Sequence, residues 1–272
     1  MDWNKSKNII ILLLLIVNVF LAANLGYSVY VQKSARNEQI ASLLEYLAAR
    51  GISMESGVLP ESGLGRVVML VERDRGLESA AADVLVPGAK SRTDGGFSRY
   101  SGSGERSLTV SSGGLLEAKN ISPTGNGEPR DASEGDLTAL LADAGISSDF
   151  VENADGFVSV CGAFDGMKIF NCVVFAQLSQ TRWDMSGRWC FGVPLPVNNE
   201  TEMDAIGLIV KFVNSVTALD IPIRTIDDIE PGYLAGTILN IGIRLIPVYK
   251  ITTDIGDFFI DAIEGALVQA EE

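Results

Sequence analysis

The sequence predicts an α+β protein with a single N-terminal transmembrane helix followed by an ectodomain of two helix-plus-antiparallel-sheet units. Three observations lead to this fold class: a charge-free apolar run near the start, helical segments followed by strands, and a polar linker at residues 122–133. We expect a cytoplasmic N-terminus at residues 1–8, the transmembrane helix at 9–31, a membrane-proximal α+β unit at 32–130 and a distal α+β unit at 131–272. The distal unit should contain a three-stranded meander, a helix and a C-terminal hairpin.

The apolar run of residues 9–31 carries no charge and reaches the length of about 20 residues that a helix needs to cross a bilayer. A cleaved signal peptide is the alternative, because Lys5 and Lys7 precede the run and Leu21-Ala22-Ala23 resembles a cleavage site. Apolar sequence continues past this site to Val31, which favours an uncleaved anchor. We therefore expect a single-pass protein of the cell membrane, with a cytoplasmic N-terminus and the bulk of the chain extracytoplasmic.

One face of this helix offers a site for helix–helix interaction. Asn18, Ala22 and Gly26 recur every four residues, so they lie on the same side of a helix. Small residues let two helix backbones approach closely in a membrane, and an amide can form an interhelical hydrogen bond. The alternative is that Asn18 and Asn24 are simply tolerated in a lone helix, because flanking leucines offset the cost of their amides.

Composition excludes several classes of function. Lys and Arg number 21 against 35 Asp and Glu, which gives a formal charge of −14 and argues against nucleic acid as a partner. Histidine is absent, which removes Ser-His-Asp catalysis, His-ligated metals and a phospho-accepting kinase core. The sequence also lacks a P-loop and a Gly-x-Ser-x-Gly motif. We expect no enzymatic activity, no cofactor and no metal.

The densest acidic cluster consists of Asp227, Asp228 and Glu230. Carboxylates can bind calcium, but this spacing does not match an EF-hand loop. A solvated loop is therefore the favoured interpretation of the cluster.

Three helices are expected in the outer part of the chain. The first continues from the membrane and stops near Gly51, the second stops near Gly145, and the third covers residues 203–218. The sequence Gly-Ile-Ser follows both of the first two helices, which suggests a weak internal repeat. The expected N-terminal caps pair Ser133 with Asp136 and Thr201 with Asp204.

Antiparallel strands are expected between these helices. The first half of the ectodomain, in which Gly and Ser are frequent at residues 91–114, is expected to be smaller and looser. Asp165-Gly166 is typical of a two-residue hairpin turn and joins two of the strands. The expected strands are residues 66–72, 107–110, 157–164, 167–178, 181–192, 237–252 and 258–263.

Cys161, Cys172 and Cys190 are an odd number, so they cannot all pair within one chain. The hairpin register implied by the turn places Cys161 opposite Phe170 and Cys172 opposite Ser159, which leaves the two sulfurs diagonal on one face. Buried free thiols are therefore expected. The alternative, a catalytic thiolate, has no histidine to activate it.

Both ends of the chain resemble a known family. The opening Met1-Asp2-Trp3-Asn4-Lys5-Ser6-Lys7 and the helix segment Val17-Asn18-Val19-Phe20-Leu21 resemble the start of the YycI (WalI) family of Gram-positive bacteria. Ile246-Pro247-Val248-Tyr249-Lys250-Ile251 and Phe259-Ile260-Asp261-Ala262 are similar to its closing hairpin, a type shared with PepSY-like modules. Ile263-Glu264 departs from the Thr-Gly expected there.

The resemblance implies PepSY-like and YycH-like ectodomain units and a regulatory role. Its members are accessory proteins that act with a sister protein, YycH, on the WalK sensor histidine kinase that controls cell-wall metabolism. The expected partners are therefore a YycH-like protein, a WalK-type sensor histidine kinase and the membrane. The alternative is an anchored extracytoplasmic module of PepSY-like type that binds a peptide or inhibits a protease.

Overall fold

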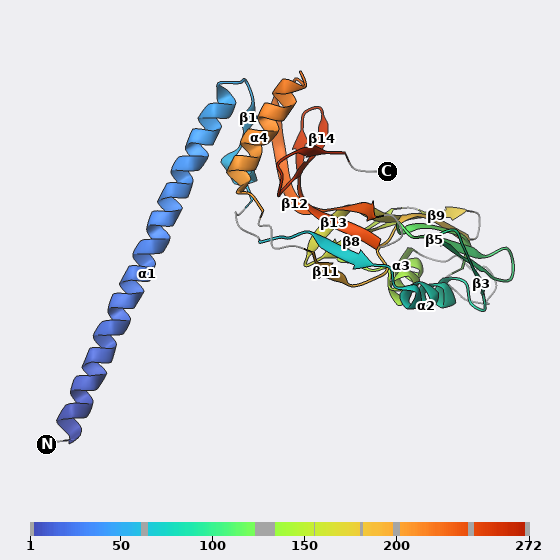
Figure 1. Ribbon diagram of the computed structural model, residues 1–272, viewed down its shortest axis with the longest axis horizontal. Coiled ribbons are helices and arrows are strands. Elements are labelled where there is room, and N and C mark those ends of the chain that lie inside the picture. Colours follow the sequence, from blue (N-terminus) through green and yellow to red (C-terminus); the bar gives the residue numbers. More distant parts are fainter. Residues whose placement is uncertain are drawn as a thin grey trace. The chain divides into compact units, whose positions relative to one another are not determined.

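The chain forms a mixed α+β structure with one N-terminal apolar helix and a large β-sheet domain (Figure 1). It divides into two compact units between Val58 and Leu59. The computed structural model describes residues 3–60, 65–122, 134–154, 156–179, 182–197, 202–238 and 242–269.

The first unit is dominated by helix α1 (Trp3–Ala48), which is followed by the short strand β1 (Ser53–Met54) and the 3₁₀ turn η1 (Ser56–Val58). The apolar segment and the following polar segment form one unbroken helix, as predicted. By length and composition this helix can cross a membrane. Gly51, at φ 77°, ends it, because the N–H of Ile52 returns to the carbonyl of Leu47.

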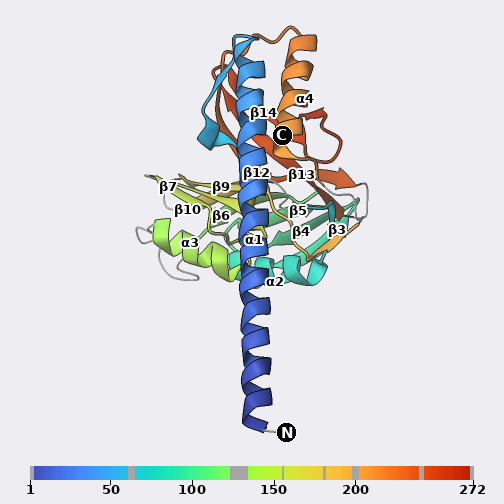
Figure 2. The same cartoon turned by 90° about the vertical axis from the view of Figure 1, so that its left-hand side faces the viewer.

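The second unit contains an eight-stranded antiparallel sheet with the order β7-β8-β9-β10-β6-β5-β4-β3. Helices α2 and α3 lie on one side of this sheet (Figure 2). Its elements are α2 (Arg75–Leu85), β3 (Lys90–Asp94), β4 (Phe97–Ser101), β5 (Ser107–Ser111), β6 (Leu115–Ile121), α3 (Glu134–Asp143), β7 (Val151–Ala154), β8 (Phe157–Phe164), β9 (Met167–Ser179) and β10 (Arg182–Arg188).

The chain builds this sheet from two successive segments, each of which is a helix followed by four antiparallel strands. The first runs from α2 to β6 and the second from α3 to β10, and the last strands of the two segments pair in the middle of the sheet. Because the segments share one sheet, the expected division of the ectodomain near residue 130 is not confirmed. Residues 123–133 themselves lie outside the described part of the chain.

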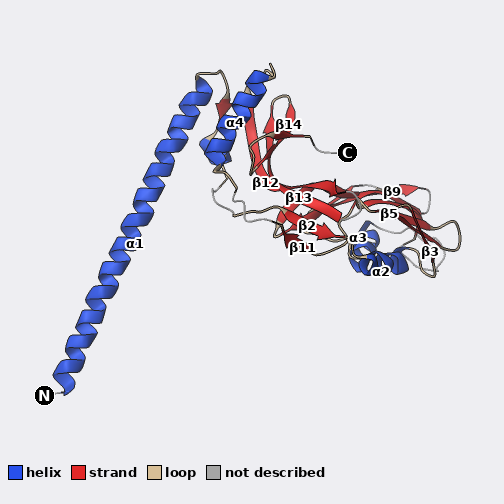
Figure 3. Ribbon diagram, viewed as in Figure 1, coloured by secondary structure: helices blue, strands red, loops and turns tan. Residues whose placement is uncertain are grey.

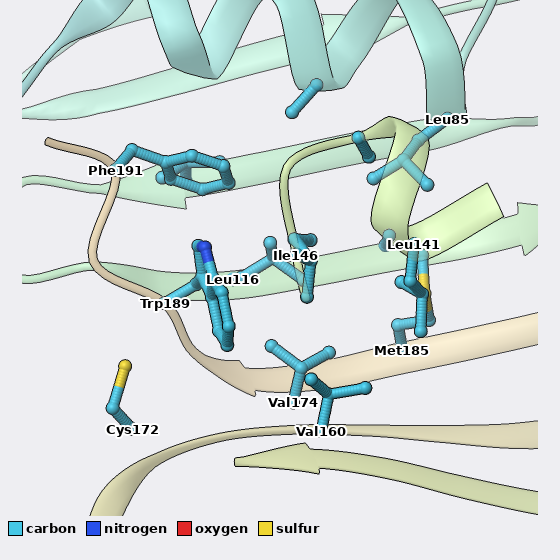
Figure 4. Packing of buried hydrophobic residues seen from close by; sticks show 14 of the residues in the cluster. Leu85, Leu116, Leu141, Ile146, Val160, Cys172, Val174, Met185, Trp189 and Phe191 are labelled. Atoms are coloured by element: carbon cyan, nitrogen blue, oxygen red, sulfur yellow. The ribbon is translucent and has the colours of Figure 1, made fainter. Parts of the chain in front are cut away.

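One hydrophobic core lies between the sheet and its two helices (Figure 4). Leu85 from α2 and Leu141 and Ile146 from the α3 region meet Val174 and Met185 from the sheet. Trp183, Trp189 and Phe191 are also buried.

The remaining strands continue from β9 into a second group that packs with helix α4 (Figure 3). One parallel pairing, Tyr233 with Ile169, connects β12 to β9. The rings of Phe212 and Phe258 lie 5.6 Å apart, which joins α4 to β14. The elements are β2 (Met69–Glu72), β11 (Pro194–Pro196), α4 (Ala205–Ala218), β12 (Thr225–Ile238), β13 (Gly242–Thr253), β14 (Gly256–Asp261) and β15 (Leu267–Val268).

Helix α2 was not predicted, although its sequence contains the signal for it. Asp74 caps it by accepting from the N–H groups of Gly76 and Leu77. Its buried residues, Glu78, Ala81, Ala82 and Leu85, follow helical spacing. Two alanines make this buried face small, so the apolar pattern is weak.

Several strand predictions also need correction. Residues 90–101, for which no strand was expected, form β3 and β4, whose hairpin turns at Gly95 and Gly96 with positive φ. Residues 237–252 were expected to be one strand, but β12 ends at Ile238 and β13 begins at Gly242. The predicted hairpin at Asp165-Gly166 is confirmed, with φ of 52° and 72° as a type I′ turn requires.

The helix ends explain the repeat suggested by the sequence. Gly145 has φ 75°, and the N–H of Ile146 returns to the carbonyl of Leu141, as at the end of α1. The repeated Gly-Ile therefore reflects a shared helix stop. Asp204 is itself the N-cap of α4, whereas Ser133 and Thr201 lie outside the described residues.

Candidate functional site

The predicted helix–helix site lies within α1, whose helical backbone places Asn18, Ala22 and Gly26 on one face. Asn18 Nδ2 donates to the carbonyl oxygen of Leu14 at 2.9 Å. This bond uses one of the two N–H groups of the amide, and an amide also has an accepting oxygen. Asn18 can therefore bind a partner helix while it keeps its bond within α1, and its role stays a prediction.

The cysteines are arranged differently from the prediction. Cys161 pairs with Val173, because the strand pairing shifts by three residues between Cys161 and Ala163. A shift by an odd number of residues moves a side chain to the other face of the sheet. The prediction that the sulfurs of Cys161 and Cys172 share a face is therefore wrong.

Cys172 instead lies against Cys190, with 3.5 Å between the two Sγ atoms. Cys172 is buried, at 1% exposure, and its thiol lies 3.3 Å from the carbonyl oxygen of Arg188. Cys190 is half-buried in the segment that follows β10. Contact with the Cys190 thiol and burial raise the pKa of Cys172 well above its ordinary value, so Cys172 keeps its proton at neutral pH in this arrangement.

These two cysteines are next to the junction between β9 and β12. Asn171 accepts from the N–H of Ala235 at 2.7 Å and donates to its carbonyl oxygen at 2.8 Å. Arg188 Nη1 donates to the same carbonyl at 3.0 Å. Side chains from β9 and β10 thus make hydrogen bonds that the single β9–β12 backbone pairing does not provide.

A buried ion pair fixes the entry to the C-terminal strands. Arg66 Nε lies 2.7 Å from Glu202 Oε2, and Arg66 Nη1 donates to the carbonyl oxygens of Gly232 and Val248 at 2.8 Å. The guanidinium also lies over the ring of Tyr249, 4.4 Å from its centroid. One side chain therefore holds β12, β13 and the segment before α4 together.

This cluster contains buried polar atoms without a hydrogen-bond partner in the described part of the chain: Arg66 Nη2, Glu202 Oε1 and the hydroxyl of Tyr249. Burial also raises the pKa of the Tyr249 phenol, so the hydroxyl keeps its proton at neutral pH. The arrangement fixes the positions of the strands through Arg66.

The acidic cluster does not lie in a loop, which corrects the prediction. Asp227, Asp228 and Glu230 belong to β12, where a register irregularity follows Ile226. Glu230 pairs with Lys168 of β9 at 2.9 Å. Within the described ranges, no three Cys, Asp or Glu side chains converge as metal ligands would.

An apolar groove of about 710 Å³ lies beside the C-terminal end of α4. Its wall is formed by the end of that helix and by β14 and β15. The lining residues are Leu219, Ile221, Asp257, Phe258, Phe259, Leu267, Val268 and Gln269. It is the candidate surface for a bound peptide.

Sequence reasoning missed Arg66, Glu202, Asn171 and Arg188. A charged residue directly before the apolar run Val67-Val68-Met69 was the only local signal for a buried arginine. Each partner lies far away in the chain, so sequence spacing could not have paired them.

Comparison with known proteins found no matching family model and no matching curated protein. An uncharacterized protein from Eubacterium rectale is similar in structure, with 10% sequence identity, a TM-score of 0.43, and coverage of 78% of this chain and 86% of that chain. The YpeB C-terminal domain of Bacillus megaterium has 12% identity and a TM-score of 0.37, over 74% of this chain and 98% of that chain. At these scores neither similarity identifies a function.

Proposed function

We propose that this chain is a non-enzymatic, membrane-anchored regulator of a sensor histidine kinase that controls cell-wall metabolism. It acts with a YycH-like partner through contacts of its transmembrane helix and its ectodomain. The N-terminus is cytoplasmic and the β-sheet domain extracytoplasmic. This proposal follows the resemblance of the two chain ends to the YycI family.

The observation that carries the proposal is the continuity of α1. The helix has 46 residues, which at 1.5 Å per residue gives a length of about 70 Å. Only about 30 Å of this length is needed to cross the hydrocarbon core. A regulator of this type can therefore carry a displacement along one rigid element between the domain and the membrane.

The experiment is co-purification of the full-length chain from native membranes, compared with a variant in which residues 9–31 are replaced by an unrelated transmembrane helix. We expect the natural chain to recover a sensor kinase and a YycH-like protein. The replaced helix should recover less of the kinase, because its packing face is lost.

Two results of this co-purification would contradict parts of the proposal. Recovery of neither protein with the natural chain would contradict the proposal. Equal recovery with both chains would contradict the role of the helix and place the contact in the ectodomain.

The apolar groove favours a second candidate function, an anchored extracytoplasmic module that binds a peptide or inhibits a protease. Phe258, Phe259 and Leu267 line it, and such apolar surfaces suit the side chains of an extended peptide. Peptide-library binding by the full-length chain in detergent tests this function. Leu267→Asp should abolish binding, whereas Leu115→Asp, at an exposed site on β6, should not.

A further inference from the structure

We propose that Cys172 and Cys190 form an intramolecular disulfide while Cys161 stays a thiol. The pair ties β9 to the segment after β10, at the junction with β12. Its oxidant in the cell is a thiol–disulfide oxidoreductase or a small-molecule disulfide. The bond persists only outside the cytoplasm, where thiols are not kept reduced, so this part rests on the location proposed above.

The geometry already brings the correct sulfurs together. The Sγ atoms of Cys172 and Cys190 are 3.5 Å apart, and a disulfide bond of about 2.05 Å requires them to approach by roughly 1.5 Å. Cys190 lies outside a strand, where a small backbone adjustment does not break a ladder. The two sulfurs are therefore close enough to bond after a local movement.

The residues on both sides of Cys190 keep it in place. The N–H of Trp189 donates to the carbonyl of Gly114 at 2.8 Å, and the carbonyl of Phe191 accepts from the N–H of Asp74 at 2.9 Å. Figure 4 shows Cys172 at the margin of the core near the segment that carries Trp189 and Phe191. The pair is thus pre-positioned by contacts that do not involve sulfur.

Cys161 is separated from this pair by the register of the sheet. Cys161 lies opposite Val173, so its side chain is on the face of Val173, and the side chain of Cys172 is on the other face. Its thiol is 3.6 Å from the carbonyl oxygens of Gly162 and Ile169. A disulfide of Cys161 with either other cysteine would require β8 or β9 to rotate.

The reaction with oxidised glutathione balances in two exchange steps. Cys190, the more accessible thiol of the pair, attacks one glutathione sulfur as a thiolate and releases one reduced glutathione. Cys172 then loses its proton and attacks the Cys190 sulfur of the mixed disulfide, which releases the second reduced glutathione. Two protein thiols are oxidised and one glutathione disulfide is reduced to two thiols.

The position of the pair gives the bond a mechanical consequence. Asn171 and Arg188, which hold Ala235 of β12, are each within two residues of one of the bonded cysteines. Oxidation therefore restrains two of the side chains that connect the eight-stranded sheet to β12. We expect it to raise the thermal midpoint of the full-length protein.

Trypsin separates the three cysteines, because cleavage after Lys and Arg leaves Cys161 in residues 131–168, Cys172 in 169–182 and Cys190 in 189–211. The full-length protein in detergent is incubated with oxidised glutathione, denatured in N-ethylmaleimide, digested and analysed by mass spectrometry. We expect peptides 169–182 and 189–211 to be joined and peptide 131–168 to be alkylated. The thermal midpoint should rise and return to its original value after reduction.

Matched variants identify the bond. Cys161→Ser should keep the linked peptides and the shift in midpoint, whereas Cys172→Ser and Cys190→Ser should each lose both. A link that includes Cys161 would overturn the proposal. The unfolded protein, oxidised under the same conditions, is the control for the oxidant. If it forms disulfides while all three thiols of the folded protein are alkylated, the proposal is also overturned.

Alkylation of intact native membranes then separates the two proposals. A bond that forms in the purified protein but is absent from native membranes would contradict the extracytoplasmic location and leave the assignment of the cysteine pair intact. A bond present in both supports both.

Discussion

Arg66 and Glu202 are separated by 136 positions in the sequence, yet Nε and Oε2 lie 2.7 Å apart and each side chain is only 1% exposed. Both charges have lost their water, so each depends on the other for compensation. The pair also fixes the carbonyl groups of Gly232 and Val248 through the same guanidinium.

Removing one partner of this pair should destabilise the domain strongly. Arg66→Leu leaves the Glu202 carboxylate buried without its cation and removes hydrogen bonds to two strands. We expect a loss of about 3–5 kcal/mol in the free energy of unfolding. Urea denaturation of the detergent-solubilised protein, followed by tryptophan fluorescence, measures it.

The matched control is the surface pair of Lys119 and Glu117, whose side chains are each 60% exposed. Lys119→Ala should leave the free energy of unfolding almost unchanged, because water and salt screen this exposed pair. Comparable losses for the two variants would show that burial of Arg66 does not determine its contribution.

The same substitution should have opposite effects at two glycines. Gly166 has φ 72° in the hairpin turn, so Gly166→Ala should cost about 1–2 kcal/mol in unfolding free energy. Gly207 lies in α4, where an added methyl group meets no atom within 4 Å, so Gly207→Ala should gain up to about 1 kcal/mol. Thermal unfolding of both variants measures the difference, and a loss at both sites would contradict it.

Acid should weaken the contribution of Asp257. A hydrogen bond from Lys250, at 2.8 Å, and one from Thr252 lower the pKa of Asp257 below its ordinary value. A carboxylate with a lowered pKa in the folded state stabilises the protein above the unfolded value of about 3.9 and loses this contribution as pH falls through the folded value. Asp257→Asn should therefore be less stable than the natural protein at pH 7, and the difference should disappear in acid.

Urea midpoints of the two proteins between neutral and acidic pH test this dependence. In a Lys250→Met background, Asp257→Asn should have a smaller effect at pH 7, because the main cause of the shift is gone. A difference that is the same at every pH would contradict the assignment.

Substitutions on the predicted face of α1 should change kinase output without lowering protein level. Ala22→Leu and Gly26→Leu block close approach of a second helix. Asn18→Leu removes an interhelical hydrogen bond of about 0.5–2 kcal/mol, enough to weaken association several-fold. A reporter of kinase activity, with immunoblotting for protein level, measures the effect.

The controls for this face must lie on the opposite side of the helix. Leu13→Ala and Phe20→Ala do so, because at 100° per residue each is displaced by roughly 120–180° from Asn18, Ala22 and Gly26. A change in output for these two variants, with none for Asn18→Leu, Ala22→Leu and Gly26→Leu, would show that the face is assigned incorrectly.

Local sequence pattern determined the features of this protein that depend on neighbouring residues. The sequence alone predicted the charge-free run, the Asp165-Gly166 turn and the glycines that end α1 and α3. Each of these features depends only on a few adjacent residues. The spacing of Asn18, Ala22 and Gly26 likewise follows from helix geometry alone.

Only the tertiary structure decided which distant residues meet. The three-residue shift in the pairing of β8 with β9 places Cys161 on the opposite face of the sheet from Cys172. The segment after β10 places the sulfur of Cys190 next to the sulfur of Cys172. Arg66 and Glu202, which are 136 positions apart in the sequence, likewise come into contact only in the folded chain. Side-chain contacts of this kind depend on register, which one irregularity changes for every later pair, and no local pattern encodes that irregularity.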